Sequence, residues 1–146
     1  KEQKGKRKQG YGWIKNNIGE KKKKKRIIVV DDEKDFLFIT KLNLEQSGKF
    51  EVLALSSAKD ILSQFHSFKP HIILLDLLMP EMGGLEICEM LNNDPLGKGT
   101  PIIILSALDK DADKLRAFKA GVVDYLIKPI EDKELIGKIE KALQYK

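Results

Sequence analysis

Short runs of aliphatic residues alternate along most of the chain with longer segments of helical periodicity. They predict strands at 27–30, 51–55, 72–75, 102–105 and 122–127, and helices near 34–47 and at 57–66, 84–92, 110–119 and 131–144. The runs 27–30, 72–75 and 102–105 are apolar at every position and not at alternate ones, which is typical of strands covered on both faces. The pattern therefore predicts an α/β fold in which helices lie on both faces of a parallel sheet.

The helical segments differ in how clearly they show an apolar face. The last segment carries one stripe at helical spacing, formed by Leu135, Ile139, Ala142 and Leu143. The segment 110–119 carries a stripe at spacings of three, formed by Ala112, Leu115 and Phe118. In the segment 34–47, Phe36 and Ile39 share one side, but Asn43 interrupts their stripe. We expect each stripe to face the core.

The charge is divided unevenly along the chain. The 146 residues carry a net charge of +5, but residues 1–26 hold 12 of the 27 Lys and Arg and 2 of the 22 Asp and Glu, so this segment carries +10 and the remainder −5. We expect residues 1–26 to be a disordered basic tail, a linker or a cloning remnant, and residues 27–146 to form one domain. Tyr11 and Trp13 are the only aromatics of the basic segment, which is weak support for nucleic-acid binding.

The single cysteine and the hydropathy of the chain bear on its location. Cys88 excludes an internal disulfide framework, fits a reducing compartment, and lies at helical spacing from Leu85 and Leu91. We expect it to be a buried core thiol. No run approaches the roughly 18 consecutive apolar residues of a membrane span. We therefore expect a soluble, cytoplasmic protein.

Polar residues directly follow four of the predicted strands: Asp31 and Asp32, Asp76, Ser106, and Lys128. The carboxyl ends of parallel strands meet at one edge of a sheet, where ligands bind. Carboxylates about 4 Å apart repel by roughly 4 kcal/mol at an effective dielectric near 20, so three of them favour a bound cation. Mg²⁺ takes carboxylate and phosphate oxygens as ligands. The cluster thus predicts a metal-assisted phosphoryl site.

Each of these groups has a role in phosphoryl transfer. Asp76 can attack phosphorus as a nucleophile and hold an acyl phosphate. A metal held by Asp32 and Asp76, with Asp31 assisting through water, would offset the charge of the phosphoryl oxygens. Lys128 supplies a second positive charge and Ser106 a hydroxyl donor. A lone Asp after a strand is usually a helix N-cap, but five such groups at one edge favour an active site.

The sequence around these residues resembles the receiver domains of two-component response regulators, typified by the bacterial chemotaxis regulator. The resemblance spans about 27–145, and its motifs are Val30-Asp31-Asp32-Glu33, Leu75-Asp76 with Met79-Pro80 and Gly84, Leu105-Ser106-Ala107, and Asp124-Tyr125-Leu126-Ile127-Lys128-Pro129. It implies a doubly wound, flavodoxin-like sheet of five parallel strands in the order 2-1-3-4-5.

The resemblance also implies how the acidic residues divide their work. Asp76 would be the phosphoacceptor. Asp32, Asp76 and the backbone carbonyl of Leu78 would hold Mg²⁺, or Mn²⁺ in its place, and Asp31 would contact the ion through water.

The residues at the fourth and fifth strand ends receive switch roles from the same resemblance. Ser106 would shift to bond the phosphoryl group, and Lys128 would pair with it. Tyr125 would be the aromatic residue that turns inward, and the peptide bond before Pro129 would be cis, a geometry that Pro accepts at modest cost.

Two apolar residues are expected to tune the lifetime of the phosphorylated state. Leu78 stands two residues after the phosphoacceptor and Leu108 two residues after the hydroxyl residue. By resemblance both flank the path of an attacking water, which neither can orient by hydrogen bonding. We expect slower loss of the phosphoryl group than in receivers with polar residues there.

The resemblance implies a signalling switch and not an enzyme. A histidine kinase or phosphotransfer protein would phosphorylate Asp76, and the fourth and fifth strands with their helices would change the surface offered to a partner or output domain. A homodimer through the face from the fourth to the fifth helix is a further expected contact, whereas nucleic-acid binding by the receiver itself is not expected.

Three alternatives remain open. The chain could be the receiver of a hybrid sensor kinase or phosphorelay. A pseudo-receiver used only for docking would lack one of the five groups, and none is missing. A phosphohydrolase resembling the haloacid dehalogenase family would carry a second Asp two residues after the nucleophile, where this chain has Leu78.

Overall fold

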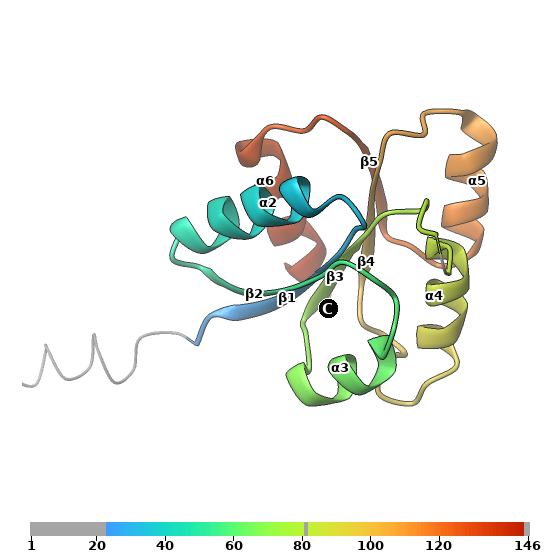
Figure 1. Ribbon diagram of the computed structural model, residues 1–146, viewed down its shortest axis with the longest axis horizontal. Helices are drawn as coiled ribbons and strands as arrows, with labels where there is room; N and C mark the ends of the chain where they lie inside the picture. Colours follow the sequence, from blue (N-terminus) through green and yellow to red (C-terminus); the bar gives the residue numbers. More distant parts are fainter. Residues whose placement is uncertain (1–22, 81, 145–146) are drawn as a thin grey trace, which may run out of the picture.

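A five-stranded parallel sheet forms the centre of the computed structural model, which describes residues 23–80 and 82–144 (Figure 1). The elements follow one another as β1 Lys25–Val30, α2 Lys34–Gln46, β2 Phe50–Leu55, α3 Ile61–Phe68, β3 Ile72–Leu75, α4 Gly84–Asn92, β4 Ile102–Ser106, α5 Asp111–Lys119, β5 Asp124–Ile127 and α6 Asp132–Gln144. The strand order is β2-β1-β3-β4-β5, with every pair parallel. The predicted α/β fold and its strand order are confirmed.

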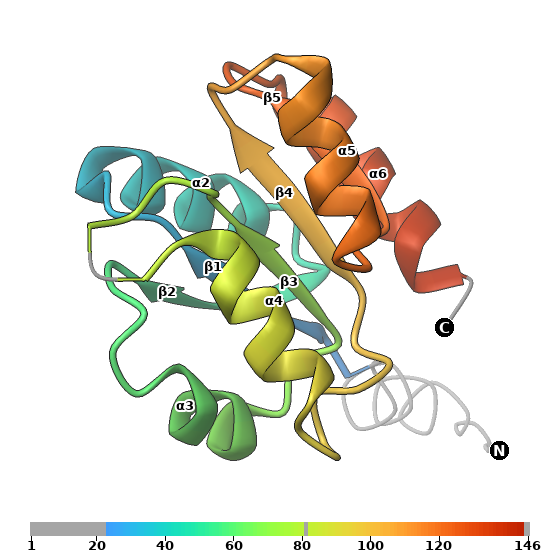
Figure 2. The ribbon, with the colours of Figure 1, turned by 90° about the vertical axis from the view of Figure 1, so that its right-hand side faces the viewer.

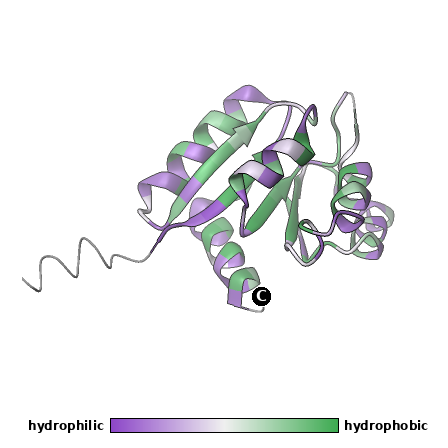
Figure 3. Cartoon of the chain, turned by 90° about the horizontal axis from the view of Figure 1, so that it is seen from below, coloured by the Kyte–Doolittle hydropathy of each residue, from purple (hydrophilic) through white to green (hydrophobic). Residues whose placement is uncertain are grey.

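Alternate residues of the buried strands build two separate cores. On β1, Ile28 and Val30 face the core shared with α3, α4 and α5, while Ile27 and Val29 face the core shared with α2 and α6. Figures 1 and 2 show these two helical layers on opposite faces of the sheet. Figure 3 shows hydrophobic central strands beside helices that mix hydrophobic and hydrophilic residues. This double burial explains why the runs 27–30, 72–75 and 102–105 of the three central strands are continuously apolar.

The helix expected at 57–66 begins later in the structure. The Lys59 N–H donates to the Ser57 hydroxyl oxygen at 2.8 Å, and Asp60 has a φ of 62° in the left-handed region. These local bonds form a turn in place of a first helical turn, so α3 runs from Ile61 to Phe68. The strand expected at 122–127 is also shorter and begins at Asp124.

The apolar stripe expected on the first helix was wrong. The residues of α2 that are buried against the sheet are Leu37, Thr40 and Leu44, whereas Ile39 is 51% exposed and Phe36 is only partly buried. The buried set has the same helical spacing, displaced by one residue. Periodicity shows that certain apolar residues share one side of a helix. Several sides of this helix carry apolar residues, so periodicity alone does not identify the buried side.

The stripe expected on the segment 110–119 was also wrong. Leu115 is 56% exposed, Phe118 is 47% exposed, and Ala112 is exposed, while the buried residues of α5 are Asp113 and Ala117. A small Ala side chain lets the helix approach the sheet closely, which leaves the larger residues outside. On α6, by contrast, the predicted stripe does pack against the core.

Two further expectations concern burial and membrane spans. Cys88 is fully buried, as predicted, and burial raises the pKa of its thiol to about 11. Within the described part of the chain, no helix has the length and hydropathy to cross a membrane. The predicted basic tail lies outside the described residues up to position 22, and Lys25 and Arg26 belong to β1.

Candidate functional site

The sheet places two buried acids side by side at its carboxyl edge. Val30 of β1 pairs with Leu75 of β3, so the next residue of each strand, Asp31 and Asp76, emerges at the same level. The Asp76 N–H donates to the Val30 carbonyl at 3.0 Å, which fixes the backbone at this point. Asp31 is 1% exposed and Asp76 is 7% exposed. Both carboxylates are therefore held in a site with little access to water.

A third carboxylate completes an acidic cluster. Oxygens of Asp31, Asp32 and Asp76 lie within 4.8 Å of one another, and Asp32 is the exposed member. Three negative charges at this separation repel strongly when two of them are buried. Their oxygens are the ligand type that a hard divalent cation prefers. The cluster is chemically suited to hold such an ion at the rim of the site.

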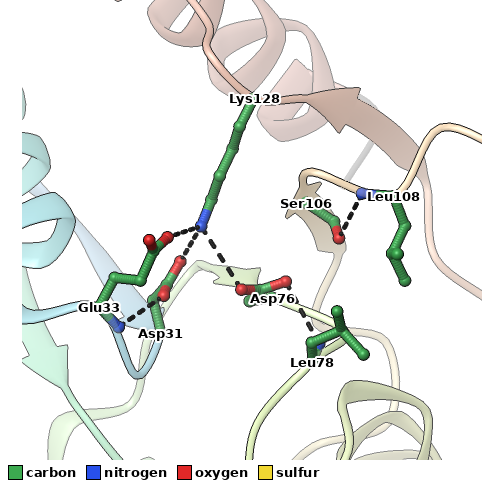
Figure 4. Close-up of polar contacts among 7 residues, drawn as sticks. All are labelled: Asp31, Glu33, Asp76, Leu78, Ser106, Leu108 and Lys128. Atoms are coloured by element: carbon green, nitrogen blue, oxygen red, sulfur yellow. Dashed lines mark hydrogen bonds and ion pairs between the residues drawn. The ribbon is translucent and has the colours of Figure 1, made fainter.

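The Lys128 ammonium lies among these acids (Figure 4). Its Nζ is 2.6 Å from Asp31 Oδ2, 2.9 Å from Glu33 Oε1 and 3.4 Å from Asp76 Oδ2, and it lies 4.1 Å from the centroid of the Phe36 ring. Burial disfavours the charged ammonium, but the hydrogen bonds to the carboxylates outweigh burial and raise the pKa of Lys128. The lysine is therefore a fixed positive charge beside Asp76.

The same environment favours the charged form of Lys128 but disfavours the charged form of Asp31. Burial, the largest effect, raises its pKa, and the bonds from the Lys128 ammonium and from the Glu33 N–H at 2.9 Å counteract this only in part. Asp31 is thus a carboxylate that lacks full compensation. An additional cation at the cluster would supply the positive charge that Asp31 lacks.

The hydroxyl residues form a connected group on the neighbouring strands. Ser106, at the end of β4, is fully buried, and its Oγ accepts a hydrogen bond from the Leu108 N–H at 3.2 Å. The Tyr125 hydroxyl donates to the Leu108 carbonyl at 2.7 Å. Tyr125 is 8% exposed, so its ring is turned inward, and burial raises its pKa. The loop after β4 is held from both sides.

Backbone contacts tie this group to the lysine. The Lys128 N–H donates to the Ser106 carbonyl at 2.8 Å, and the Lys128–Pro129 peptide bond is cis, as expected. Figure 4 shows Ser106 on one side of Asp76 and Asp31 on the other. Leu78, which is 57% exposed, places its N–H 3.3 Å from Asp76 Oδ1. The ends of β3, β4 and β5 thus converge on Asp76.

The structure brings together all the groups that the sequence singled out at this edge, and it adds two that the prediction missed. Glu33 appeared in the first motif without a role, yet it pairs with Lys128. Phe36 packs partly against the core, and its ring also lies beside the Lys128 ammonium, a contact that the sequence did not predict. A signal was present in their position, because Glu33 is the N-cap of α2 and Phe36 lies in its first turn, shortly after the strand end that carries Asp31.

Comparisons with known proteins agree with the fold and with the residues at the strand ends. A family model described as the response regulator receiver domain matches residues 27–140. The alkaline phosphatase synthesis transcriptional regulatory protein PhoP of Bacillus subtilis is 33% identical over 113 residues, which cover 77% of this chain and 46% of PhoP. The chain therefore spans about half the length of that curated relative.

Solved structures share the fold. A putative response regulator from Chloroflexus aurantiacus is 31% identical, with a TM-score of 0.78, and the match covers 84% of this chain and 99% of that one. A response regulator receiver domain protein from Methanospirillum hungatei is 28% identical, with a TM-score of 0.77 and coverage of 84% and 96%. Fold, strand-end residues and family match agree, and the chain belongs to the response regulator receiver domain family of two-component systems.

Proposed function

We propose that this chain is a phosphorylation switch in which Asp76 accepts a phosphoryl group from the phosphohistidine of a histidine kinase or phosphotransfer protein. The observation that carries the proposal is the convergence of three carboxylates within 4.8 Å, with the Lys128 ammonium 3.4 Å from Asp76. A nucleophilic carboxylate, oxygen ligands for a cation and a fixed positive charge are the parts that phosphoryl transfer requires.

The acidic cluster fits Mg²⁺, and the same oxygen chemistry suits Mn²⁺. Receiver domains of this family bind Mg²⁺ at an acidic pocket, and here the carboxylates of Asp31, Asp32 and Asp76 form such a cluster. The proposed direct ligands are Asp32, Asp76 and the backbone carbonyl of Leu78, and Asp31 would contact the ion through water. When bound, the ion would offset the negative charge of the phosphoryl oxygens.

The transfer itself is an exchange of one bond to phosphorus for another. An Asp76 carboxylate oxygen attacks phosphorus, the P–N bond to the donor histidine breaks, and its electron pair leaves on the imidazole nitrogen, which takes up a proton. Lys128 stays beside the new phosphoryl oxygens and stabilises their charge. Later attack of water at phosphorus releases inorganic phosphate and restores the Asp76 carboxylate.

The proposed response begins at Ser106. Its hydroxyl turns toward the phosphoryl group and gives up the hydrogen bond from the Leu108 N–H. Tyr125 is bonded to the carbonyl of that same Leu108, so movement of the loop is coupled to the aromatic ring. The surface formed by α5, β5 and α6 then changes, and it is there that we expect an output domain or a second copy of the chain to bind.

The alternatives differ in what they leave unexplained. A receiver of a hybrid kinase or phosphorelay would use the same site, so this alternative concerns the partners and not the chemistry. A docking-only module gives no reason for a buried, incompletely compensated acid beside a lysine. A phosphohydrolase of the dehalogenase type lacks its second acid, since Leu78 occupies that position.

The test is a titration of the full chain with Mg²⁺ and beryllofluoride, a mimic of the phosphoryl group, followed by NMR. We expect chemical-shift changes at Ser106, Tyr125 and Lys128 in the parent and none of these in Asp76→Asn. Mg²⁺ alone should shift the residues of the acidic cluster. If the parent does not respond to beryllofluoride, the chain is a docking module and the switch hypothesis is wrong.

The lifetime of the phosphorylated state gives a separate prediction. Leu78 is 57% exposed and Leu108 is half-buried, and neither side chain can orient a water molecule by hydrogen bonding. We expect Leu108→Glu and Leu78→Asn each to speed loss of the phosphoryl group by about tenfold, because a positioned polar group assists attack by water. The decay of the phosphorylated form after removal of the donor measures this.

A matched control is Leu96→Asn, which places the same polar group at a leucine that is 60% exposed in the loop between α4 and β4. Its decay rate should equal that of the parent. Dephosphorylation that is unchanged or slower in either site variant would contradict the prediction.

A further inference from the structure

The Lys128 ammonium has two neighbours, Glu33 and Phe36, to which the proposed function gives no role. The ring of Phe36, in the first turn of α2, has its centroid 4.1 Å from Lys128 Nζ. The face of an aromatic ring carries partial negative charge and attracts a cation at this distance, more strongly where water is excluded. The Lys128 side chain is 11% exposed, so little of it is open to water.

The groups around the ammonium fall into two kinds. Asp31 and Asp76 contact Lys128, but both also belong to the proposed metal and phosphoryl site, so their interactions change when an ion binds or when Asp76 is phosphorylated. Glu33 and Phe36 belong to neither group. Only these two of the four neighbours can hold the ammonium in the same way before and after the transfer.

The ring of Phe36 is itself fixed by the fold. Phe36 is partly buried against the core shared by α2 and α6, and the next residue, Leu37, is buried in that core. The Leu37 N–H bonds to the Glu33 carbonyl at 3.0 Å, so the helix sets the spacing between Glu33 and Phe36. A free lysine side chain carries about 2 kcal/mol of rotamer entropy. A rigid neighbour reduces the entropy that is lost when the ammonium meets the phosphoryl group.

We propose that Phe36 is a positioning residue for phosphoryl transfer, whose ring holds the Lys128 ammonium beside Asp76 while the other contacts of the lysine change. The inference rests on the proposed function above. It requires the aromatic face and not merely an apolar side chain, since leucine would fill the same part of the core without attracting a cation.

The experiment uses the full chain, saturating Mg²⁺ and acetyl phosphate, in which the bond from phosphorus to the acetate oxygen breaks and acetate leaves. Mass spectrometry follows formation of phosphorylated Asp76 at several donor concentrations. We expect the maximal rate of Phe36→Leu to be about fivefold lower, the size of one cation–π contact, with the half-saturating donor concentration unchanged. Phe36→Trp, which keeps an aromatic face, should restore the parent rate to within about twofold.

Phe38→Leu is the matched control, because Phe38 lies on the same helix two residues along and is 67% exposed. Its rate should equal that of the parent, and thermal unfolding followed by circular dichroism verifies that each variant is folded. A parent rate for Phe36→Leu, or equal losses for Phe36→Leu and Phe36→Trp, would overturn the positioning role. If the parent itself takes up no phosphoryl group, the proposed function fails first, and the inference is overturned with it.

Discussion

Lys128→Met destabilises the protein in the absence of divalent cations by about 3 kcal/mol, the lower end of the range for breaking a buried ion pair. We expect the lower end because the exposed Asp32 and Glu33 leave the rim of the site open to water. Methionine keeps the length of the side chain and can pack on the Phe36 ring, so lost charge is the main effect. Asp31, 1% exposed, is then left without its ammonium partner.

Urea unfolding in EDTA, followed by circular dichroism, measures this free energy. Lys138→Met is the control, because Lys138 pairs with Asp124 at 3.7 Å on the surface and such a pair contributes at most about 1 kcal/mol. Equal losses in the two variants would show that Lys128 does not compensate the acids.

The loss should also depend on pH and on Mg²⁺. The pKa of Asp31 is already raised by burial, and removal of Lys128 raises it further, so the cost is present where the carboxyl is charged and shrinks as the pH falls through that pKa. Mg²⁺ should bind the variant about tenfold more tightly than the parent, because the ammonium no longer repels the ion or occupies Asp31. An affinity that is unchanged would contradict this account.

Gly84→Ala is expected to destabilise the protein by about 2 kcal/mol and to slow phosphorylation of Asp76. A Cβ at Gly84 would lie 2.5 Å from the Asp76 carbonyl oxygen and 2.9 Å from the Leu77 Cα, both of which are backbone atoms that cannot move aside alone. The loop after β3 would have to shift, and the Gly84 N–H bond to the Leu77 carbonyl at 3.0 Å would be lost. Because Asp76 is part of that loop, its carboxylate would move as well.

Gly137→Ala is the matched control and should have the opposite sign. Nothing lies within 4 Å of a Cβ at Gly137, which is inside α6, so alanine should stabilise the protein by up to about 1 kcal/mol. Urea unfolding of the two variants separates backbone crowding from a general effect of the added methyl group. A stabilised Gly84→Ala would contradict the crowding.

The fold could be predicted because buried strands are visible in the sequence as apolar runs. Most of the site could be predicted because its residues directly follow those runs. A strand that is buried on both faces can be recognised in the sequence as an apolar run. The residue that follows this run must lie at the edge of the sheet. Asp31, Asp76, Ser106 and Lys128 were located in this way before any contact was known, and the structure places them at that edge. Their roles in phosphorylation remain predictions.

Contacts between helices and the site could not be predicted in the same way. The orientation of a helix is set by how closely its small residues can approach the sheet, as Ala117 shows on α5. Spacing alone assigns Leu115 and Phe118 to the core, yet both are exposed. Spacing also does not show that Phe36, which packs partly against the core, contacts Lys128. The spacing of apolar residues shows which of them share one side of a helix. Packing against the sheet determines which side of the helix is buried.

The exposed stripe of α5 also has an energetic consequence. This helix buries only Asp113 and Ala117, so it loses little hydrophobic contact when it tilts or slides. Changing the ratio of two arrangements from 1:99 to 99:1 requires about 5.5 kcal/mol, and less is needed when the two arrangements start closer to equal energy. Because α5 buries so few apolar side chains, we expect the energy gap between its two arrangements to be small. If the proposed switch is correct, a single charged group on Asp76 then reverses the populations while the sheet stays intact.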